Sequence, residues 1–119
     1  MDLKTSPLAP DSFPDLPVIR GVRFAAAAAG VKYKDRNDVM LAVMDAGTSV
    51  AGVFTRLATR SASVLDCQDK LGGDAAGPAA ILVNSGNSNA FTGHYGQTSV
   101  AELCAAVAAE TGIDAGRVF

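Results

Sequence analysis

Three asparagines, two serines and two glycines lie within the ten residues 84–93. Asn and Ser side chains hydrogen-bond to nearby backbone groups, and Gly and Asn tolerate left-handed backbone angles. This composition predicts a tight, stiff loop whose amide groups line the edge of a site. The alternative is an elaborate turn that satisfies only its own backbone, and composition leaves both interpretations open.

Known loop motifs do not account for this segment. The spacing of Gly86 and Gly93 fits neither the dinucleotide-binding fingerprint nor the P-loop, and no lysine follows Gly93. None of the three asparagines has Ser or Thr two residues later, so the segment holds no glycosylation acceptor.

Few other side chains suggest chemistry. The single histidine, His94, has no acidic partner or nucleophile beside it in sequence, which favours an exposed histidine over a member of a catalytic triad. Asp66 and Asp69 lie three residues apart, a spacing typical of surface charge. No cluster of His, Cys, Asp and Glu has the spacing of metal ligands.

The composition fits one small globular domain. The chain has 119 residues, of which 49% are hydrophobic and 18% charged, enough apolar residues for a core. Alanine is abundant and aromatic residues are 6%, so we expect a core of small side chains. A net charge of −2 offers no general attraction for nucleic acid or for an anionic membrane.

Cysteine usage and hydropathy favour a cytoplasmic location. Cys67 and Cys104 lack any metal-binding spacing and are expected to be free thiols, as in a reducing compartment. No apolar run approaches the length of a membrane span, and the N-terminus lacks a basic region followed by an apolar one, as a secretory signal would have.

Short apolar runs predict a mixed sheet. Residues 79–83 read as a strand buried on both faces that delivers the polar loop. Residues 18–34 predict two strand segments around an alanine-rich bend, and 39–46 with 49–55 predict a hairpin. The charged turn 32–38 is expected to be a solvated hairpin tip.

Two helices are expected to pack on this sheet. Ser63 could cap a helix through Leu71 that Gly72 and Gly73 end, and 72–78 is then a surface loop. Apolar residues recur at three and four positions over 98–111, where Gly112 ends a second helix. Cys104 lies on its packing face. The pattern predicts an α/β fold, of the α+β kind with a mixed sheet and packed helices.

The ends of the chain differ from its middle. Four of the five prolines lie in residues 1–17, which predicts an extended N-terminal arm preceding a single, incomplete domain over 18–119. Residues 113–119 start a new apolar segment, so we expect the chain to be one piece of a longer polypeptide.

Residues 83–93 closely resemble the VNSGNANAxTG signature of the ornithine acetyltransferase family, the glutamate N-acetyltransferases of the ArgJ type in arginine biosynthesis, with Ser88 in place of Ala. Residues 21–34 are similar to the family's N-terminal segment, and 51–62 to its AGVFT region. Leu57 and Ala58 stand where Asn-Arg is often found. The resemblance extends over about residues 18–119.

The resemblance implies an N-terminal-nucleophile scaffold of the DmpA/ArgJ type, incomplete in this chain. Family members are made as one precursor that cleaves itself before a threonine. That threonine carries acetyl from N-acetylornithine to glutamate by ping-pong transfer, beside an oxyanion hole built around a Thr-Gly pair. Both are expected beyond Phe119, so this chain should hold no catalytic residue and be inactive alone.

The partners implied are the β chain of the same precursor, the two amino-acid substrates, and further α/β pairs in a higher oligomer such as a heterotetramer. No cofactor is implied, although acetyl-CoA could donate acetyl in a bifunctional member. Neither nucleic acid nor membrane is expected. The residues expected to support the oxyanion segment without touching substrate are Asn84, Gly86, Asn87, Asn89, Thr92 and Gly93.

The sequence leaves two other functions open. One is a truncated, inactive structural or interaction fragment, and the other is an aminopeptidase on the related scaffold. The sequence after Phe119 distinguishes them: a Thr-Gly pair and a self-cleavage site favour the acetyltransferase, and a stop codon favours the fragment.

Overall fold

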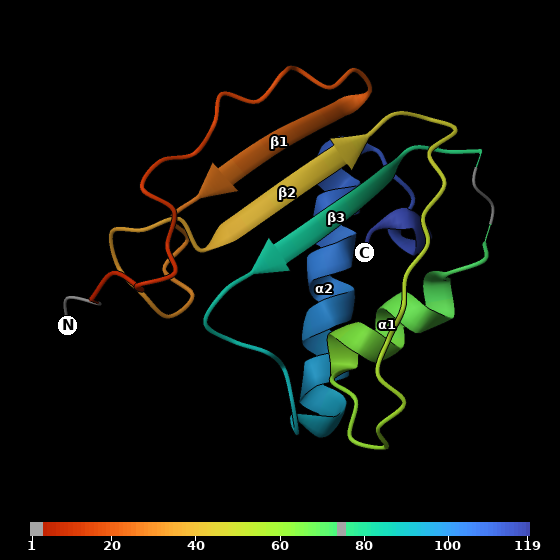
Figure 1. The fold of residues 1–119 in the computed structure, drawn as a ribbon. Helices are drawn as coiled ribbons and strands as arrows, with labels where there is room; N and C mark the ends of the chain where they lie inside the picture. The colour runs from red at the N-terminus through yellow and green to blue at the C-terminus, as the bar shows by residue number, and fades with distance from the viewer. Residues whose placement is uncertain (1–3, 74–75) are drawn as a thin grey trace.

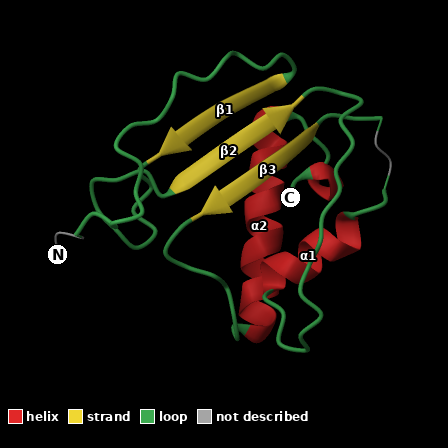
Figure 2. Ribbon diagram, viewed as in Figure 1, coloured by secondary structure: helices red, strands yellow, loops and turns green. Residues whose placement is uncertain are grey.

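The computed structural model describes residues 4–73 and 76–119, which form a sheet with helices on one side (Figure 1). Three antiparallel strands, β1 (Val22–Ala27), β2 (Val39–Met44) and β3 (Ala79–Asn84), lie in the order β1-β2-β3. The helices α1 (Ala62–Lys70) and α2 (Gly93–Thr111) lie against one face of it, and a short 3-10 helix, η1 (Ala115–Arg117), follows (Figure 2). The predicted α/β fold class is confirmed.

Small side chains fill the core, as the composition predicts. The buried cluster joins α1, α2, β3 and the segment after α2, and Leu41, Val43 and Leu82 pack against it. Its largest fully buried side chain is Val118. Its buried members are Ala62, Ala80, Val100, Cys104, Val107, Ile113 and Val118.

The first half of the sheet differs from its prediction. Residues 25–27 continue β1 instead of bending away from it, because pairing with β2 outweighs the helix propensity of alanine. Residues 49–55 form no strand, so the predicted hairpin is wrong. Both edges of β2 are already paired, with β1 and with β3, and neither leaves room for another strand.

β3 is not buried on both faces. Leu82 packs against the core, whereas Ile81 and Val83 keep 36% and 46% of their surface exposed. The reason is that α1 and α2 cover one face of the sheet only. Phe24 of β1 is exposed as well, so the sheet bears an open face with apolar side chains.

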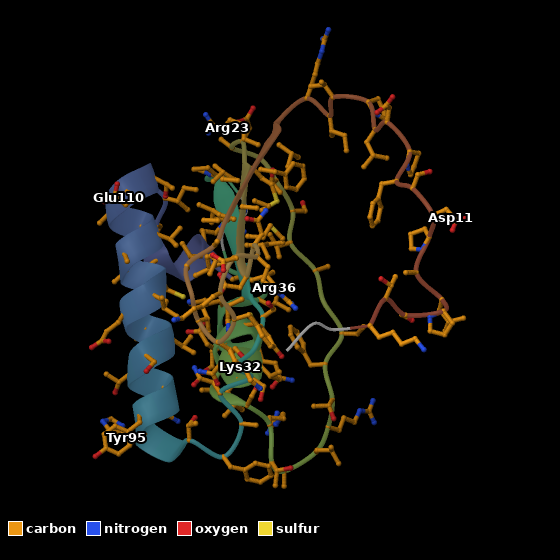
Figure 3. All side chains as sticks on the ribbon, turned by 90° about the vertical axis from the view of Figure 1, so that its left-hand side faces the viewer. Asp11, Arg23, Lys32, Arg36, Tyr95 and Glu110 are labelled. Carbon is orange, nitrogen blue, oxygen red and sulfur yellow. The ribbon has the colours of Figure 1, made fainter. Side chains whose placement is uncertain are left out.

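The structure describes most of the predicted N-terminal arm. Residues 4–20 contain no helix or strand and are exposed, while residues 1–3 of the predicted arm lie outside the described residues. Figure 3 shows Asp11 on the side of the strands away from Glu110 of α2. The division into an arm and one domain over 18–119 stays a prediction.

The charged turn 32–38 is exposed at its tip, as predicted, but Asp38 is buried.

The two helices begin earlier than their sequence signals suggest. Ser61, not Ser63, caps α1, and its hydroxyl accepts a hydrogen bond from the Val64 N–H (3.4 Å). α2 begins at Gly93, five residues before the predicted start. The prediction missed the first turn because that turn carries no apolar periodicity. Its end matches the prediction, with Gly112 in the left-handed region (φ 72°).

Replacing Ser61 with alanine should lower the free energy of unfolding by about 0.5–1 kcal/mol, because α1 loses its only side-chain cap. Ser63→Ala is the matched control: its hydroxyl contacts that of Ser61 (3.2 Å) and caps no N–H. Urea unfolding of both variants checks the assignment. Equal losses in the two would show that the cap is misassigned.

A lysine ties α1 to α2 and to the segment after it. Lys70 Nζ donates to Asp66 Oδ2 (2.6 Å), to the Val118 carbonyl (2.9 Å) and to Cys104 Sγ (3.2 Å). Burial disfavours the ammonium, but the hydrogen bonds to Asp66 and Cys104 outweigh it and raise the pKa of Lys70. Burial also raises the pKa of the Cys67 thiol, with a further contribution from Asp66. Both cysteines are free.

Candidate functional site

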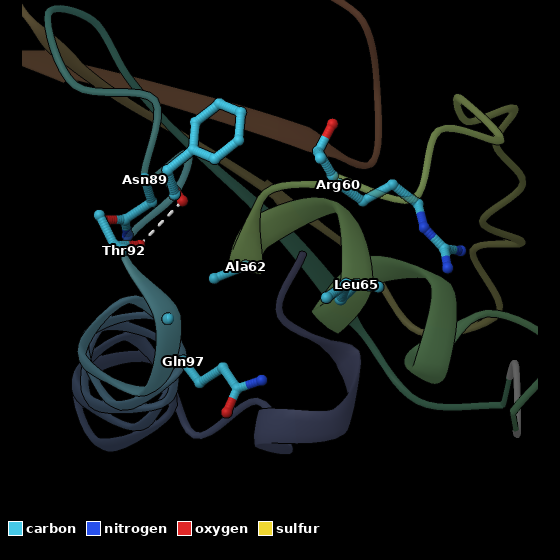
Figure 4. Close-up of a pocket in the computed structure, with 9 residues that line it drawn as sticks. Arg60, Ala62, Leu65, Asn89, Thr92 and Gln97 are labelled. Atoms are coloured by element: carbon cyan, nitrogen blue, oxygen red, sulfur yellow. Dashed lines mark hydrogen bonds between the residues drawn. The ribbon is translucent and has the colours of Figure 1, made fainter.

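The polar segment between β3 and α2, which we call the asparagine loop (residues 85–92), is held by its own side chains and by that of Asn84, the last residue of β3. Asn84 Nδ2 donates to the Asn87 carbonyl (3.0 Å), and Asn87 Oδ1 accepts from the Asn89 N–H (3.1 Å). Thr92 Oγ1 donates to the Asn89 carbonyl (3.0 Å), as Figure 4 shows. These bonds fix the shape of the loop, as expected for a tight turn rich in Asn and Ser.

Left-handed backbone angles shape the loop. Gly86 has φ 97° and Gly93 has φ 55°, while Asn89 (51°) and Phe91 (58°) adopt the same region. Asn tolerates this conformation, whereas a bulky aromatic residue rarely does. The Phe91 side chain is 87% exposed. The loop therefore keeps a strained residue at its surface, next to the start of α2.

Gly86 permits a close approach between the loop and the β1–β2 connection. A Cβ placed on Gly86 would lie 2.6 Å from Lys32 Cβ and 3.4 Å from Tyr33 Cε2. No side chain larger than hydrogen fits there, and the positive φ also favours glycine. Lys32 and Tyr33 therefore pack directly against the first turn of the asparagine loop.

A hollow of about 200 Å³ separates the loop from the start of α1 (Figure 4). Asn89 and Thr92 line it on the loop side, and Ala62 and Leu65 line it on the α1 side. The Arg60 guanidinium points away from it in Figure 4 and donates to Gln68 Oε1 (2.8 Å). The full lining is Thr59, Arg60, Ala62, Leu65, Asn89, Phe91, Thr92, Gly93 and Gln97.

This hollow offers amides and hydroxyls but no reactive pair. Its lining contains no Cys, His, Asp, Glu or Lys, so the described residues provide it with neither a thiol nucleophile nor a general base. Across residues 4–73 and 76–119, no three His, Cys, Asp or Glu side chains converge as metal ligands would. The amides and hydroxyls of this arrangement can support or orient a neighbouring segment.

Residues 118–119 run along the outer edge of β3, in the direction of the asparagine loop. Phe119 N–H donates to the Ala80 carbonyl (2.8 Å), the Phe119 carbonyl accepts from Leu82 N–H (2.7 Å), and Val118 pairs with Ala80 in parallel. Backbone groups on one strand edge alternate, so the next pair on this edge is the Leu82 carbonyl and the Asn84 N–H. A strand that continued in this register would run beside Asn84, where the loop begins.

Arg117 anchors that parallel segment. Its guanidinium donates to the carbonyls of Thr48 (2.5 Å), Gly77 (3.3 Å) and Pro78 (3.4 Å). Three carbonyls from two loops thus hold the residue that precedes Val118 and Phe119. The direction of the segment along β3 is therefore fixed by several independent bonds.

The other residues singled out from sequence do not line the hollow. His94 is exposed in the first turn of α2, in agreement with the interpretation as an exposed histidine. Asp66 pairs with Lys70, Asp69 is exposed, and Cys104 is buried on the packing face of α2. The structure brings Asn84, Asn87 and Asn89 together, and places Thr92 and Gly93 at the hollow.

Sequence reasoning missed the roles of Asp38, Lys70 and Arg117. Asp38 lay in a run of charged residues, where only its position just before the apolar run 39–46 could have marked it as different. Lys70 and Arg117 bond to carbonyls 48 and 69 residues away in the chain, and no local pattern indicates such partners.

In the part of the chain that the structure describes, no helix combines the length and hydropathy that crossing a membrane requires. α2, with 19 residues, is the longest described helix, and it carries a glutamate in its middle and another near its end.

Comparison with known proteins identifies relatives over nearly the whole chain. The ArgJ family model matches residues 23–119. The arginine biosynthesis bifunctional protein ArgJ of Ruegeria pomeroyi is 75% identical over 116 residues, which is 98% of this chain and 28% of that protein. The protein of the same name from Agrobacterium fabrum is 50% identical over the whole chain, again 28% of its own length.

Two solved structures share the fold. One is the arginine biosynthesis bifunctional protein ArgJ of Bacillus halodurans, with a TM-score of 0.74 and 29% identity, covering 83% of this chain and 51% of that one. The other is the ornithine acetyltransferase of Mycobacterium tuberculosis complexed with ornithine, with a TM-score of 0.69 and 35% identity, covering 83% and 53%. The expected ArgJ-like scaffold is thus confirmed, and the chain spans little more than a quarter of the full-length relatives.

Proposed function

Because the chain belongs to the ArgJ family, we propose that it forms the N-terminal part of a glutamate N-acetyltransferase of arginine biosynthesis. The complete enzyme moves acetyl from N2-acetyl-L-ornithine to L-glutamate. The relatives' names place them in arginine biosynthesis and call them bifunctional, which supports the assignment and suggests acetyl-CoA as a second donor. Residues 1–119 alone are inactive in this proposal.

The chemistry follows from a threonine in the residues after Phe119. Self-cleavage frees its amine, which acts as the base while its hydroxyl attacks the acetyl carbonyl of N-acetylornithine. The C–N bond to ornithine breaks, and ornithine leaves with the proton. The amine of glutamate then attacks the acetyl-threonine ester and restores the hydroxyl. A Thr-Gly pair stabilises the oxyanion formed in each step.

The observation that carries the proposal is the parallel pairing of Val118 and Phe119 with β3. In this register, residue 121 would donate to the Leu82 carbonyl and accept from the Asn84 N–H. The following few residues, where the family has its Thr-Gly pair, would then lie beside Asn84 and Gly86. The asparagine loop would support the oxyanion segment from one side, without touching the substrate.

The open face of the sheet suits a larger assembly. Phe24, Ile81 and Val83 expose apolar surface there, on the side that α1 and α2 leave uncovered. We propose that the remainder of the same polypeptide, including its β chain, covers this face, and that α/β pairs associate further. Burial of this surface would contribute roughly 25 cal/mol for each Å² removed from water.

The test uses the full-length polypeptide, meaning this chain together with the residues that follow Phe119. Intact-mass analysis should find two fragments, the second beginning with threonine. An exchange assay with labelled N-acetylornithine should deliver the label to glutamate. A single uncleaved chain without exchange would contradict the proposal, and release of free amino acids from peptides would instead indicate an aminopeptidase.

A further inference from the structure

Asp38, which sequence reasoning placed in a solvated turn, is a buried carboxylate. Only 4% of its surface is exposed, and its oxygens accept two short hydrogen bonds, Oδ1 from the Ala29 N–H (2.7 Å) and Oδ2 from the Val31 N–H (2.6 Å). Among the described residues no lysine, arginine or histidine forms an ion pair with it. Two backbone donors thus hold a charge that would otherwise be costly to bury.

The backbone of the same residue reaches the asparagine loop. The Asp38 carbonyl accepts from the Ser85 N–H (2.8 Å), and its own N–H donates to the Ala27 carbonyl (3.0 Å). Ser85 is the first residue after β3, so this bond fixes where the loop leaves the strand. Asp38 therefore joins the end of β1, the β1–β2 connection and the start of the loop.

The segment that the Asp38 carboxylate holds, residues 29–31, makes a second connection to the loop. Ala29 and Val31 lead directly into Lys32 and Tyr33, which bear on Gly86 of the asparagine loop. The Arg36 guanidinium lies over the Tyr33 ring, 4.3 Å from its centre, and steadies this side of the contact. The first two residues of the loop are thus held by a backbone bond on one side and by packing on the other.

We propose that Asp38 is a positioning residue for acetyl transfer, which fixes the start of the asparagine loop at the end of β3. The inference rests on the proposed function, since it takes the loop to support the oxyanion segment. Asp38 touches no substrate. It acts through Ser85 and Gly86, and a shift of the loop by a fraction of an ångström would misplace the oxyanion donors.

A carboxylate is required because two N–H groups point at it. Asn in its place offers one acceptor oxygen and turns an NH₂ group toward the second N–H, so one bond is lost and two donors face each other. Asp38→Asn therefore loosens the 29–31 segment while keeping the size of the side chain. Asp38→Ala removes both bonds.

The experiment measures acetyl transfer and thermal stability in the full-length polypeptide. Assayed well below the melting temperature, Asp38→Asn should have a kcat lower by about tenfold or more. Its KM for N-acetylornithine should change less than twofold. Asp35→Asn is the matched control, because Asp35 is exposed in the same turn and loses the same charge. Val107→Ala, in the core of α2, controls for loss of stability alone.

Unchanged kcat in Asp38→Asn, or an equal fall in Val107→Ala at similar loss of melting temperature, would overturn the proposal. Hydrogen exchange of peptides covering residues 84–92 gives a readout independent of activity. Exchange should quicken in Asp38→Asn and stay unchanged in Asp35→Asn. If the wild-type polypeptide transfers no acetyl group, the proposed function fails. Unchanged hydrogen exchange in Asp38→Asn would separately refute the claim that Asp38 holds the loop.

Discussion

Replacing Gly86 with alanine should lower the free energy of unfolding by about 2–4 kcal/mol, more than most single surface substitutions. Two costs add at this position. A left-handed residue with a Cβ costs about 1–2 kcal/mol, and Gly86 has φ 97°. The new Cβ would also lie 2.6 Å from Lys32 Cβ, so the two segments must separate, at about 1–2 kcal/mol.

Gly47 provides the matched control for that prediction. Its φ of 84° is close to that of Gly86, but a Cβ there would meet nothing within 4 Å. Gly47→Ala should therefore show the backbone cost alone, about 1–2 kcal/mol. Urea unfolding of both variants separates the two contributions. If Gly86→Ala costs no more than Gly47→Ala, the predicted clash between the new Cβ and Lys32 is wrong.

Replacing Asn87 with alanine should lower acetyl transfer by the full-length polypeptide about 10–100-fold. The change deletes the oxygen that accepts from the Asn89 N–H, and with it the bond that closes the middle of the loop. Because this bond is exposed, the loss of stability should be small, about 0.5–1 kcal/mol. Asn89→Ala should act in the same direction and also place a Cβ-bearing alanine at φ 51°.

Ser88 offers a control for Asn87. It lies in the same loop with an exposed side chain, and alanine there restores the residue typical of the family signature. Ser88→Ala should leave turnover and melting temperature unchanged. Steady-state kinetics with N-acetylornithine and glutamate compare the variants. Equal turnover in Asn87→Ala and wild type would refute the supporting role of the loop.

Features set by neighbouring residues could be read from the sequence. The apolar run that ends in Asn84 becomes β3, and the Gly- and Asn-rich residues after it form a self-bonded loop, because both depend on local backbone preferences. Gly112 ends α2 for the same reason. The sequence predicted Ser63 as the cap of α1, whereas the structure has Ser61 there, because only the geometry of the first turn decides which hydroxyl reaches an unpaired N–H.

Features set by distant residues could not be read in this way. Residues 49–55 look like a strand, yet β2 is already paired on both edges, and strand partners are chosen by the whole sheet. The burial of Asp38 depends on how the β1–β2 connection folds back over it. Of the candidate site, the sequence indicated the asparagine loop and the side chains that bond within it, but not Asp38, which holds its first residue.

The most direct test of the account is to trap the acetylated enzyme. The full-length polypeptide is incubated with N-acetylornithine in the absence of glutamate, quenched, and mapped by peptide mass spectrometry. We expect one acetyl group on the threonine that begins the downstream fragment, and none on residues 1–119. An acetyl group carried by a side chain within residues 1–119, or transfer to glutamate without any acetylated enzyme, would contradict the account.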